Sequence, residues 1–324
     1  MKKRTSVWFV SLAALLVFGF SPSVPAADYP VKPVQLIVPY SPGGSLDRTA
    51  RIIAKHAEKY LGQKVVVVNR TGASGSVGFT AIAQAKPEGY VLGMGATPLI
   101  QHHLLLEGVT YTYKSFTPVV MCSYDNNTFT VKAGSPIDKP WKEFLAYMKA
   151  HPNEIPIGLG GHWSSLDLAR AAFELATGTS FRRVQFKGGA KAVASVLGGH
   201  TMATTAYQDE IYDHVKLGKL RILTFMSEKR MANFPDVPTM KELGYDVVMG
   251  VWRGVIAPNG LPDDVKKKVI EAFDKTIKDP ALKADFEKGK VPYVYKNAEE
   301  FGKIRAQGHE KITKIVQTIK ARSK

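Results

Sequence analysis

The hydrophobic positions of the chain alternate between short β-branched runs and longer segments with one apolar face. Residues 34–39 and the valines at 65–68 are typical of strands, the second apolar enough to be covered on both sides. Between them, residues 46–61 carry apolar side chains at steps of three and four, which predicts an amphipathic helix. A short helix and a strand at 90–94 follow. This order predicts a mostly parallel sheet covered by helices.

The same order of elements starts again in the second half of the chain. Strands are expected at 155–159, 181–186, 201–207 and 220–226, separated by helices. The C-terminal part is helical. Its last helix is expected to begin at Asn297, because Glu300 stands three residues on and completes a capping box.

Two rounds of strands and helices predict an α/β fold of two lobes around a cleft. Long helices at the end of such a chain usually pack back on the first lobe. We therefore expect lobe one to be discontinuous, with residues 27–125 plus 247–324, and lobe two to comprise residues 126–246.

The first 26 residues have the three parts of a secretory signal peptide. A basic head, Lys2 to Arg4, precedes an apolar run at 7–20, and small residues and prolines follow. The run is shorter than the ~20 residues of a membrane-spanning helix. We expect cleavage after Ala26 and export to the periplasm, without a lipid anchor because no cysteine lies near the cut.

The net charge of +16 is spread along the chain, with a denser stretch after Lys266. A nucleic-acid-binding protein more often has a basic stripe with a recognition motif, and neither is present, so no nucleic acid is expected as a partner. The charge could attract anionic ligands to the cleft. Alternatively, it reflects solvated lysines on helix faces.

Glycine-rich turns follow several of the expected strands and precede helices. Glycine lets backbone N–H groups approach a ligand, and a helix start carries about half a positive charge. Ligands of parallel sheets bind at this edge. One such turn could be only a tight loop, but two from each lobe predict an anion cradle. The turns are at residues 43–45, 72–75, 160–165 and 188–190.

Motifs for catalysis, cofactors and metals are missing. The glycines at 72, 75 and 78 lack the spacing and the later acid of a dinucleotide site, and no Gly-x-Ser-x-Gly or phosphate-binding loop occurs. Cys122, the single cysteine, excludes an internal disulfide and is expected to be buried and inert. His162 is the histidine expected at the site, with a surface position as the alternative. We expect no enzyme, cofactor or metal.

The segment YPVKPVQLIVPYSPGGSLD at residues 29–47 resembles the Bug (TctC-like) family, the extracytoplasmic solute receptors of tripartite tricarboxylate transporters. The likeness continues in order along the chain, at residues 61–63, 65–70, 72–75, 87–90, 186–189, 197–199, 218–221, 235–239 and 254–258.

This resemblance implies a type II periplasmic-binding-protein fold, in which a hinged cleft closes over a carboxylated solute. One carboxylate would be held mainly by backbone N–H groups and water at residues 41–45 and 72–75. Asp47 would favour the first helical turn instead of touching the anion. The implied receptor is a monomer that docks transiently with membrane permease subunits. The alternative is a periplasmic ligand receptor for a two-component sensor kinase.

The second lobe departs from the family. Ala206 stands where many members have an aspartate, so a ligand with an ammonium group is less expected. Arg253 replaces an aromatic ring and could hold a second carboxylate, which favours a di- or tricarboxylate or an aromatic carboxylate. The expected ligand-binding residues are Tyr40, Ser41, Gly43, Gly44, Ser45, Gly72, Ala73, Ser74, Gly75, Thr97, His162, Trp163, Ser164, Ser165, Gly188, Tyr207, Trp252 and Arg253.

Overall fold

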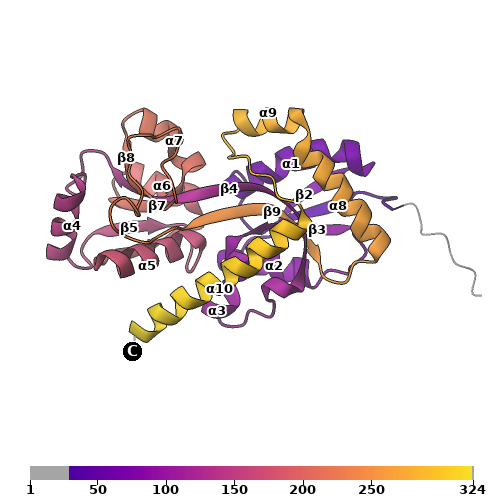
Figure 1. Cartoon of the computed structure of the whole chain (residues 1–324), viewed down its shortest axis with the longest axis horizontal. Coiled ribbons are helices and arrows are strands. Elements are labelled where there is room, and N and C mark those ends of the chain that lie inside the picture. The colour runs from indigo at the N-terminus through magenta and orange to yellow at the C-terminus, as the bar shows by residue number, and fades with distance from the viewer. Residues whose placement is uncertain (1–28, 323–324) are drawn as a thin grey trace, which may run out of the picture.

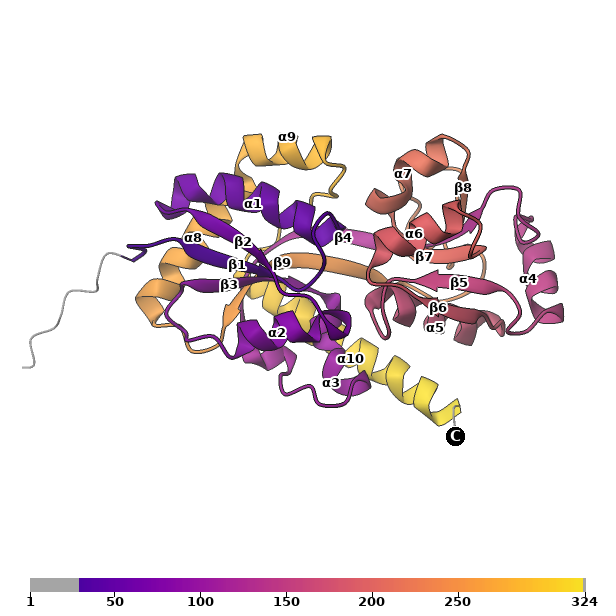
Figure 2. The ribbon, with the colours of Figure 1, turned by 180° about the vertical axis from the view of Figure 1, so that it is seen from behind.

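Two α/β lobes lie side by side in the computed structural model, which describes residues 29–322 (Figures 1 and 2). The described strands form one nine-stranded sheet of order β2-β1-β3-β9-β4-β7-β5-β6, with β8 also paired to β4. Their bounds are β1 Val34–Val38, β2 Val65–Asn69, β3 Val91–Ala96, β4 Phe116–Lys132, β5 Pro156–Leu159, β6 Arg182–Gln185, β7 Ala203–Tyr207, β8 Leu220–Phe225 and β9 Gly250–Pro258.

Helices cover both faces of the sheet in each lobe. The longer ones are α1 Ser45–Leu61, α2 Ser76–Ala83, α4 Trp141–Ala150, α5 Ser165–Thr177, α6 Gly189–Leu197, α7 Gln208–Lys216, α8 Asp263–Lys278, α9 Pro280–Lys288 and α10 Ala298–Arg322. Shorter turns are α3 His102–Leu105, η1 Ala73–Gly75, η2 Thr97–Ile100 and η3 Tyr113–Ser115.

In lobe one, β1 lies between β2 and β3 and is parallel to both. Its side chains alternate, so Leu36 packs in the core under α1 and α8, while Ile37 packs on the other side with Phe79 of α2. The apolar face predicted for residues 46–61 is buried throughout, which confirms that helix.

In lobe two, β5 pairs in parallel with β6 and β7, while β4 and β8 run antiparallel. Stacked Phe129 and Phe173 form the core under α4 and α5, with ring centroids 4.3 Å apart. Val196 and Phe225 belong to a separate cluster under α6 and α7. The expectation of mostly parallel sheets is therefore wrong in part, because β4, β8 and β9 are antiparallel.

Two long strands, β4 and β9, run between the lobes (Figure 1). From Phe116 to Asn126, β4 pairs with β9, and from Asn127 onward it pairs with β7 and β8. This change of partner marks the point in β4 where the chain passes from one lobe to the other. The division into residues 27–125 plus 247–324 and 126–246 remains our proposal for the moving units.

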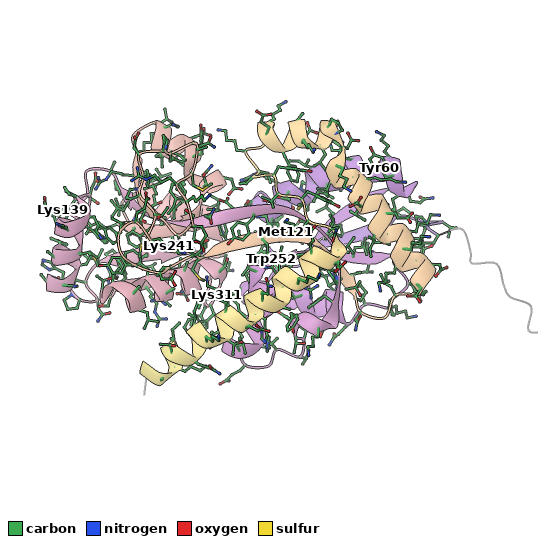
Figure 3. The ribbon with its side chains drawn as sticks, in the orientation of Figure 1. Tyr60, Met121, Lys139, Lys241, Trp252 and Lys311 are labelled. Atoms are coloured by element: carbon green, nitrogen blue, oxygen red, sulfur yellow. The ribbon has the colours of Figure 1, made fainter. Side chains whose placement is uncertain are left out.

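The C-terminal helix α10 starts with the predicted capping box. The Glu300 N–H donates to Asn297 Oδ1 at 2.9 Å, and the Asn297 N–H donates to Glu300 Oε2 at 3.2 Å. The helix packs on β4, η2 and α3, and it also contacts α5 of lobe two. Its Lys311 donates to the carbonyl of Val248, in the segment before β9, at 3.3 Å (Figure 3). Within residues 29–322, no helix has the length and apolarity to cross a membrane.

Cys122 lies fully buried in β4, as predicted, and its thiol donates to the Arg253 carbonyl at 3.2 Å. Burial raises the pKa of the thiol to about 12. Because the thiolate is the reactive form, we predict that a maleimide leaves the native protein unlabelled at pH 8 and labels it fully in guanidinium. Rapid labelling of the folded protein, followed by mass spectrometry, would contradict this.

Candidate ligand-binding cleft

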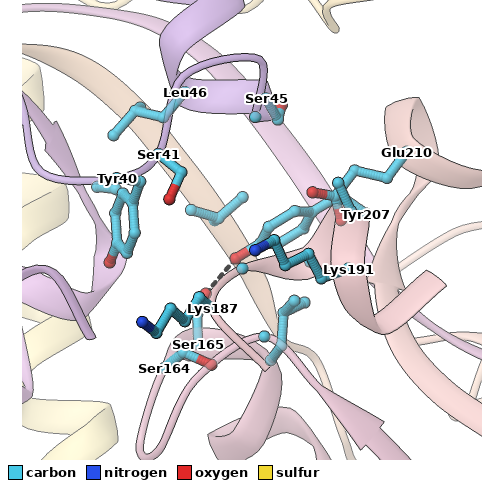
Figure 4. Close-up of a pocket in the computed structure, with 18 of the residues that line it drawn as sticks. Tyr40, Ser41, Ser45, Leu46, Ser164, Ser165, Lys187, Lys191, Tyr207 and Glu210 are labelled. Carbon is cyan, nitrogen blue, oxygen red and sulfur yellow. Dashed lines mark hydrogen bonds between the residues drawn. The ribbon is translucent and has the colours of Figure 1, made fainter. Parts of the chain in front are cut away.

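A cleft between the lobes holds two adjoining pockets. The first, called the main pocket because helix N-termini from both lobes border it, encloses about 260 Å³ between the loop after β1 and the starts of α5, α6 and α7 (Figure 4). The side pocket, of about 350 Å³, lies between residues 71–75 and the loops after β5 and β6. Both pockets share Tyr40, Ser41, Gly160, Lys187 and Gly188. They are therefore two parts of one interlobe space.

The loop at residues 41–45 leads directly into α1 at the main pocket. Two of its N–H groups are already engaged: Gly43 donates to Asp47 Oδ2 at 2.9 Å, and Gly44 donates to the Ser41 carbonyl at 3.3 Å. Asp47 also receives two bonds from Arg51 and lines neither pocket, which confirms its predicted structural role. The backbone N–H groups in the first turn of α1 are the other donors that this loop and helix could offer to a ligand.

The loop at residues 72–75 borders the side pocket in a left-handed backbone conformation. Ala73 and Ser74 have φ of 42° and 57°, and Gly75 has φ of 101°. A Cβ at Gly75 would come within 2.9 Å of the Tyr40 ring. Glycine is therefore required there by both backbone conformation and space.

The starts of α5 and α6 supply the opposite wall. Ser164 caps α5 by accepting the Asp167 N–H, and Ser165 forms a hydrogen bond with the Tyr207 hydroxyl (Figure 4). Gly188 caps α6, and residues 188–191 line the main pocket. The N-termini of α1, α5 and α6 thus meet at one space.

Arg253 lies under the main pocket and is only 1% exposed. Its Nη2 is 3.8 Å from Asp209 Oδ1 and 3.9 Å from Asp125 Oδ2, and its guanidinium sits 5.1 Å from the Tyr207 ring centroid. Burial, followed by the charge of Asp209, raises the pKa of Asp125, against the opposing effect of Arg253. The Arg253 charge is therefore already matched by buried acids.

Among residues 29–322, no cluster of three or more His, Cys, Asp or Glu side chains is arranged to hold a metal ion. The model of the tripartite tricarboxylate transporter family receptor matches residues 49–321. The chain belongs to this family. It is 34% identical to protein BugT of Bordetella pertussis, over 79% of this chain and 83% of BugT.

Solved structures agree with this assignment. A TctC solute-binding protein from Polaromonas, without ligand, is 35% identical with a TM-score of 0.70, over 90% of this chain and 99% of that one. MatC from Rhodopseudomonas palustris with bound malate and another R. palustris protein with adipate share the fold, at 22% identity and a TM-score of 0.81. They cover 89% and 90% of this chain and 100% and 98% of their own. The receptor has the predicted type II periplasmic-binding-protein fold.

Most expected ligand-binding residues of the receptor line the cleft. The main pocket includes Tyr40, Ser41, Gly43, Gly44, Ser45, Ser164, Ser165, Gly188, Tyr207 and Arg253. The side pocket includes Tyr40, Ser41, Gly72, Ala73, Ser74, Gly75, His162 and Gly188. The His162 side chain is 55% exposed, and its Nδ1 lies 3.7 Å from Asp167.

Three expected residues line neither pocket. Trp252 follows the alternation of β9 to the face opposite Arg253, where it packs edge-on against Phe301 of α10 (Figure 3). The Thr97 hydroxyl accepts the Trp252 N–H at 3.0 Å and so fixes β9. Trp163 packs on the core with its N–H donated to Asp167 Oδ2 at 2.9 Å. The structure gives these three residues packing and hydrogen-bonding roles outside the two pockets, and their contact with a ligand stays a prediction.

Three charged residues of the main pocket were not predicted: Lys187, Lys191 and Glu210. Lys187 lies in the turn before α6, Lys191 in the first turn of α6, and Glu210 in the first turn of α7 (Figure 4). The expectation against an ammonium group considered only Ala206, which is buried in β7, whereas Glu210 places an acid of lobe two at the main pocket. Glu210 could have been found as an acid just beyond the end of a predicted strand.

The lobes of the receptor contact each other directly across the cleft. Asp209 of α7 accepts the Ser45 hydroxyl and Arg48 Nη2, the latter at 3.1 Å. The Ser74 hydroxyl donates to the His162 carbonyl at 2.7 Å. These hydrogen bonds connect the two lobes across the cleft.

We predict that Asp209→Asn weakens closure, because it removes the charge that holds Ser45 and Arg48. Hydrogen bonds to charged groups contribute about 1.5–3 kcal/mol. The radius of gyration from small-angle scattering should therefore increase. The matched control is Asp213→Asn, since Asp213 forms an exposed interlobe pair with Lys290 that should contribute less than about 1 kcal/mol. Equal radii for both variants would contradict the prediction.

Proposed function

We propose that this receptor captures a small organic carboxylate and delivers it to the membrane permease of a tripartite tricarboxylate transporter. The observation that carries the proposal is the meeting of three helix N-termini, of α1, α5 and α6, at the main pocket. Each presents unpaired N–H groups and about half a positive charge. Such a space favours an anion without any metal or cofactor.

We further propose that backbone amides hold the first carboxylate. The first-turn amides of α1 and those of residues 188–190 border the pocket without bulky side chains. Lys187 and Lys191 are exposed at the same space and add positive charge near a second acidic group. Long-range attraction by these cations would speed capture more than it would fix the ligand's position.

The ligand that we propose is a di- or tricarboxylate or an aromatic carboxylate. The main pocket suits a small molecule, and its walls supply apolar surface from Leu46, Pro98 and Val251 between polar ends. The malate and adipate bound by the two R. palustris neighbours are dicarboxylates, which supports this class. Because the chain belongs to a family of transporter receptors, we propose binding without conversion.

We also propose that the protein is exported before it binds its ligand. Residues 1–26, which lie outside the described residues, would be removed after Ala26, and the mature protein would act in the periplasm as a monomer. It would dock transiently with the permease subunits in its closed, ligand-bound form.

A thermal-shift screen of mono-, di- and tricarboxylates, both aliphatic and aromatic, tests the proposal. At least one carboxylate should raise the melting temperature in a concentration-dependent way, because ligands that bind only the folded state stabilise it. Its carboxamide analogue should have no effect at the same concentration. A chain stabilised by neutral sugars or by no carboxylate would overturn the proposal.

A further inference from the structure

Glu210 places a carboxylate in the main pocket that the carboxylate-binding function does not explain. It is the third residue of α7, and its Oε2 is buried without a hydrogen-bond partner among the described residues. Its neighbour Asp209, by contrast, receives Ser45 and Arg48. An anion-binding pocket gains nothing from a second buried anion in its wall, so this acid requires its own explanation.

The fold makes room for this carboxylate. A Cβ added to Gly189, the first residue of α6, would fall 2.3 Å from Glu210 Oε2 and 2.5 Å from Oε1. Any other residue at position 189 would therefore force the Glu210 carboxylate to shift. Figure 4 shows Glu210 beside Tyr207 on the lobe-two wall, across from Ser45.

A purely structural role accounts for only part of this arrangement. Glu210 stands at the position of a helix-capping acid, and the Tyr207 N–H lowers its pKa. Burial and Asp209 act more strongly and raise that pKa to about 7. A capping acid at a solvated helix end would keep an ordinary pKa, whereas this one is desolvated and faces the ligand space.

We propose that Glu210 is a specificity-determining residue that accepts a hydrogen bond from a donor on the bound carboxylate, namely an amino or hydroxyl substituent. The inference rests on the proposed function and narrows its substrate class to amino- or hydroxy-carboxylates. An ionised carboxylate only accepts hydrogen bonds, so a ligand donor satisfies Oε2, and a ligand without one leaves it unpaired. Sites built this way reject the analogue that lacks the donor.

The neighbouring charges favour a positively charged or neutral donor over another anion at this point. Asp209, on the same helix, raises the pKa of Glu210, and Arg253 and Arg48 only partly offset this. Lys191 lines the same pocket. The titratable and charged groups around Glu210 are Arg48 of α1, Asp125 of β4, Lys191 of α6, Tyr207 of β7, Asp209 of α7 and Arg253 of β9.

Matched ligand sets test the inference by titration calorimetry at pH 8. The probes are succinate, malate and aspartate, and the one-carbon-longer set glutarate, 2-hydroxyglutarate and glutamate. Wild-type protein should bind the substituted members of at least one set about tenfold or more tightly than the unsubstituted member. Glu210→Gln should keep the hydroxyl preference and lose most of the ammonium preference, because the amide still accepts but carries no charge.

Glu210→Leu should bind the three members of a set with equal affinity. The matched control is Glu228→Gln, which changes an exposed acid of lobe two and should bind like the wild type. The preference for an ammonium group should also grow from pH 6 to pH 8 in wild type and stay constant in Glu210→Gln.

Binding of succinate and glutarate as tight as that of their substituted analogues, or a preference unchanged in Glu210→Leu, would overturn the inference and leave the proposed function standing. Failure of every carboxylate to bind wild-type protein would overturn the proposed function and this inference with it.

Discussion

Gly75→Val should abolish ligand binding, with a loss in affinity of about 100-fold or more, while the protein remains folded. The added side chain would meet the Tyr40 ring within 2.9 Å, and Tyr40 borders both pockets. The residue also has φ of 101°, where a β-branched side chain is strained by about 1–3 kcal/mol. Valine therefore displaces the loop and the ring that shape the cleft.

Gly134→Val is the control that distinguishes the effect of backbone strain from the effect of damage to the binding site. Gly134 also has a left-handed backbone, with φ of 72°, but no atom lies within 4 Å of an added Cβ and it borders neither pocket. This variant should lose similar stability and bind normally in titration calorimetry. If both variants bind with wild-type affinity, the loop at residues 72–75 does not contribute to the site.

Arg253→Met should lower the free energy of unfolding by about 3–5 kcal/mol at pH 8. The change removes the cation between buried Asp125 and Asp209, and breaking a buried pair from one side leaves the other charge uncompensated. Methionine keeps much of the apolar stem, so packing loss is small. Denaturant unfolding followed by circular dichroism measures the effect.

The loss in Arg253→Met should shrink as the pH falls. Arg253 lowers the pKa values of Asp125 and Glu210, which are raised by burial, so its removal raises both further. An acid with a raised folded-state pKa destabilises increasingly as pH rises from its unfolded value through its folded value. The deficit should therefore be smaller at pH 5 than at pH 8. Arg230→Met, which removes an exposed pair with Glu242, should cost less than about 1 kcal/mol at both.

The elements with strong apolar periodicity were predictable, and the strands that join the lobes were not. The helix α1 follows from side-chain pattern alone, because it buries a continuous apolar face. The strand β2 was predictable from its four valines, but the expectation that both of its sides are covered is wrong, because β2 is an edge strand in which Val65 is buried and Val66 is 45% exposed. The strand β4 escaped prediction because Ser123, Asp125 and Asn127 interrupt it with polar residues, all buried. Those side chains lie where β4 changes its strand partners, beside the buried charges of Arg253 and Asp209, and tertiary contacts there override the local pattern.

The parts of the site that are formed by backbone groups were predictable from the sequence. The parts that are formed by side chains were less so. Glycine turns between strands and helices marked the cradle because their conformation is a local property. The position of Trp252 outside both pockets was not predictable because β9 was not predicted as a strand, so its alternation with Arg253 went unused. Glu210 was not predicted because the position of its carboxylate depends on a tertiary contact. Gly189, on another helix, leaves the space that this carboxylate occupies.

The central claim is that the interlobe cleft binds a carboxylate and releases it unchanged. Titration calorimetry of the mature protein with the carboxylate found by the thermal screen, and with its methyl ester, tests this most directly. We predict saturable binding at one site per chain, an affinity loss of about tenfold or more for the ester, and full recovery of the unaltered carboxylate after denaturation. Equal affinity for the ester, or recovery of a chemically altered product, would contradict the account.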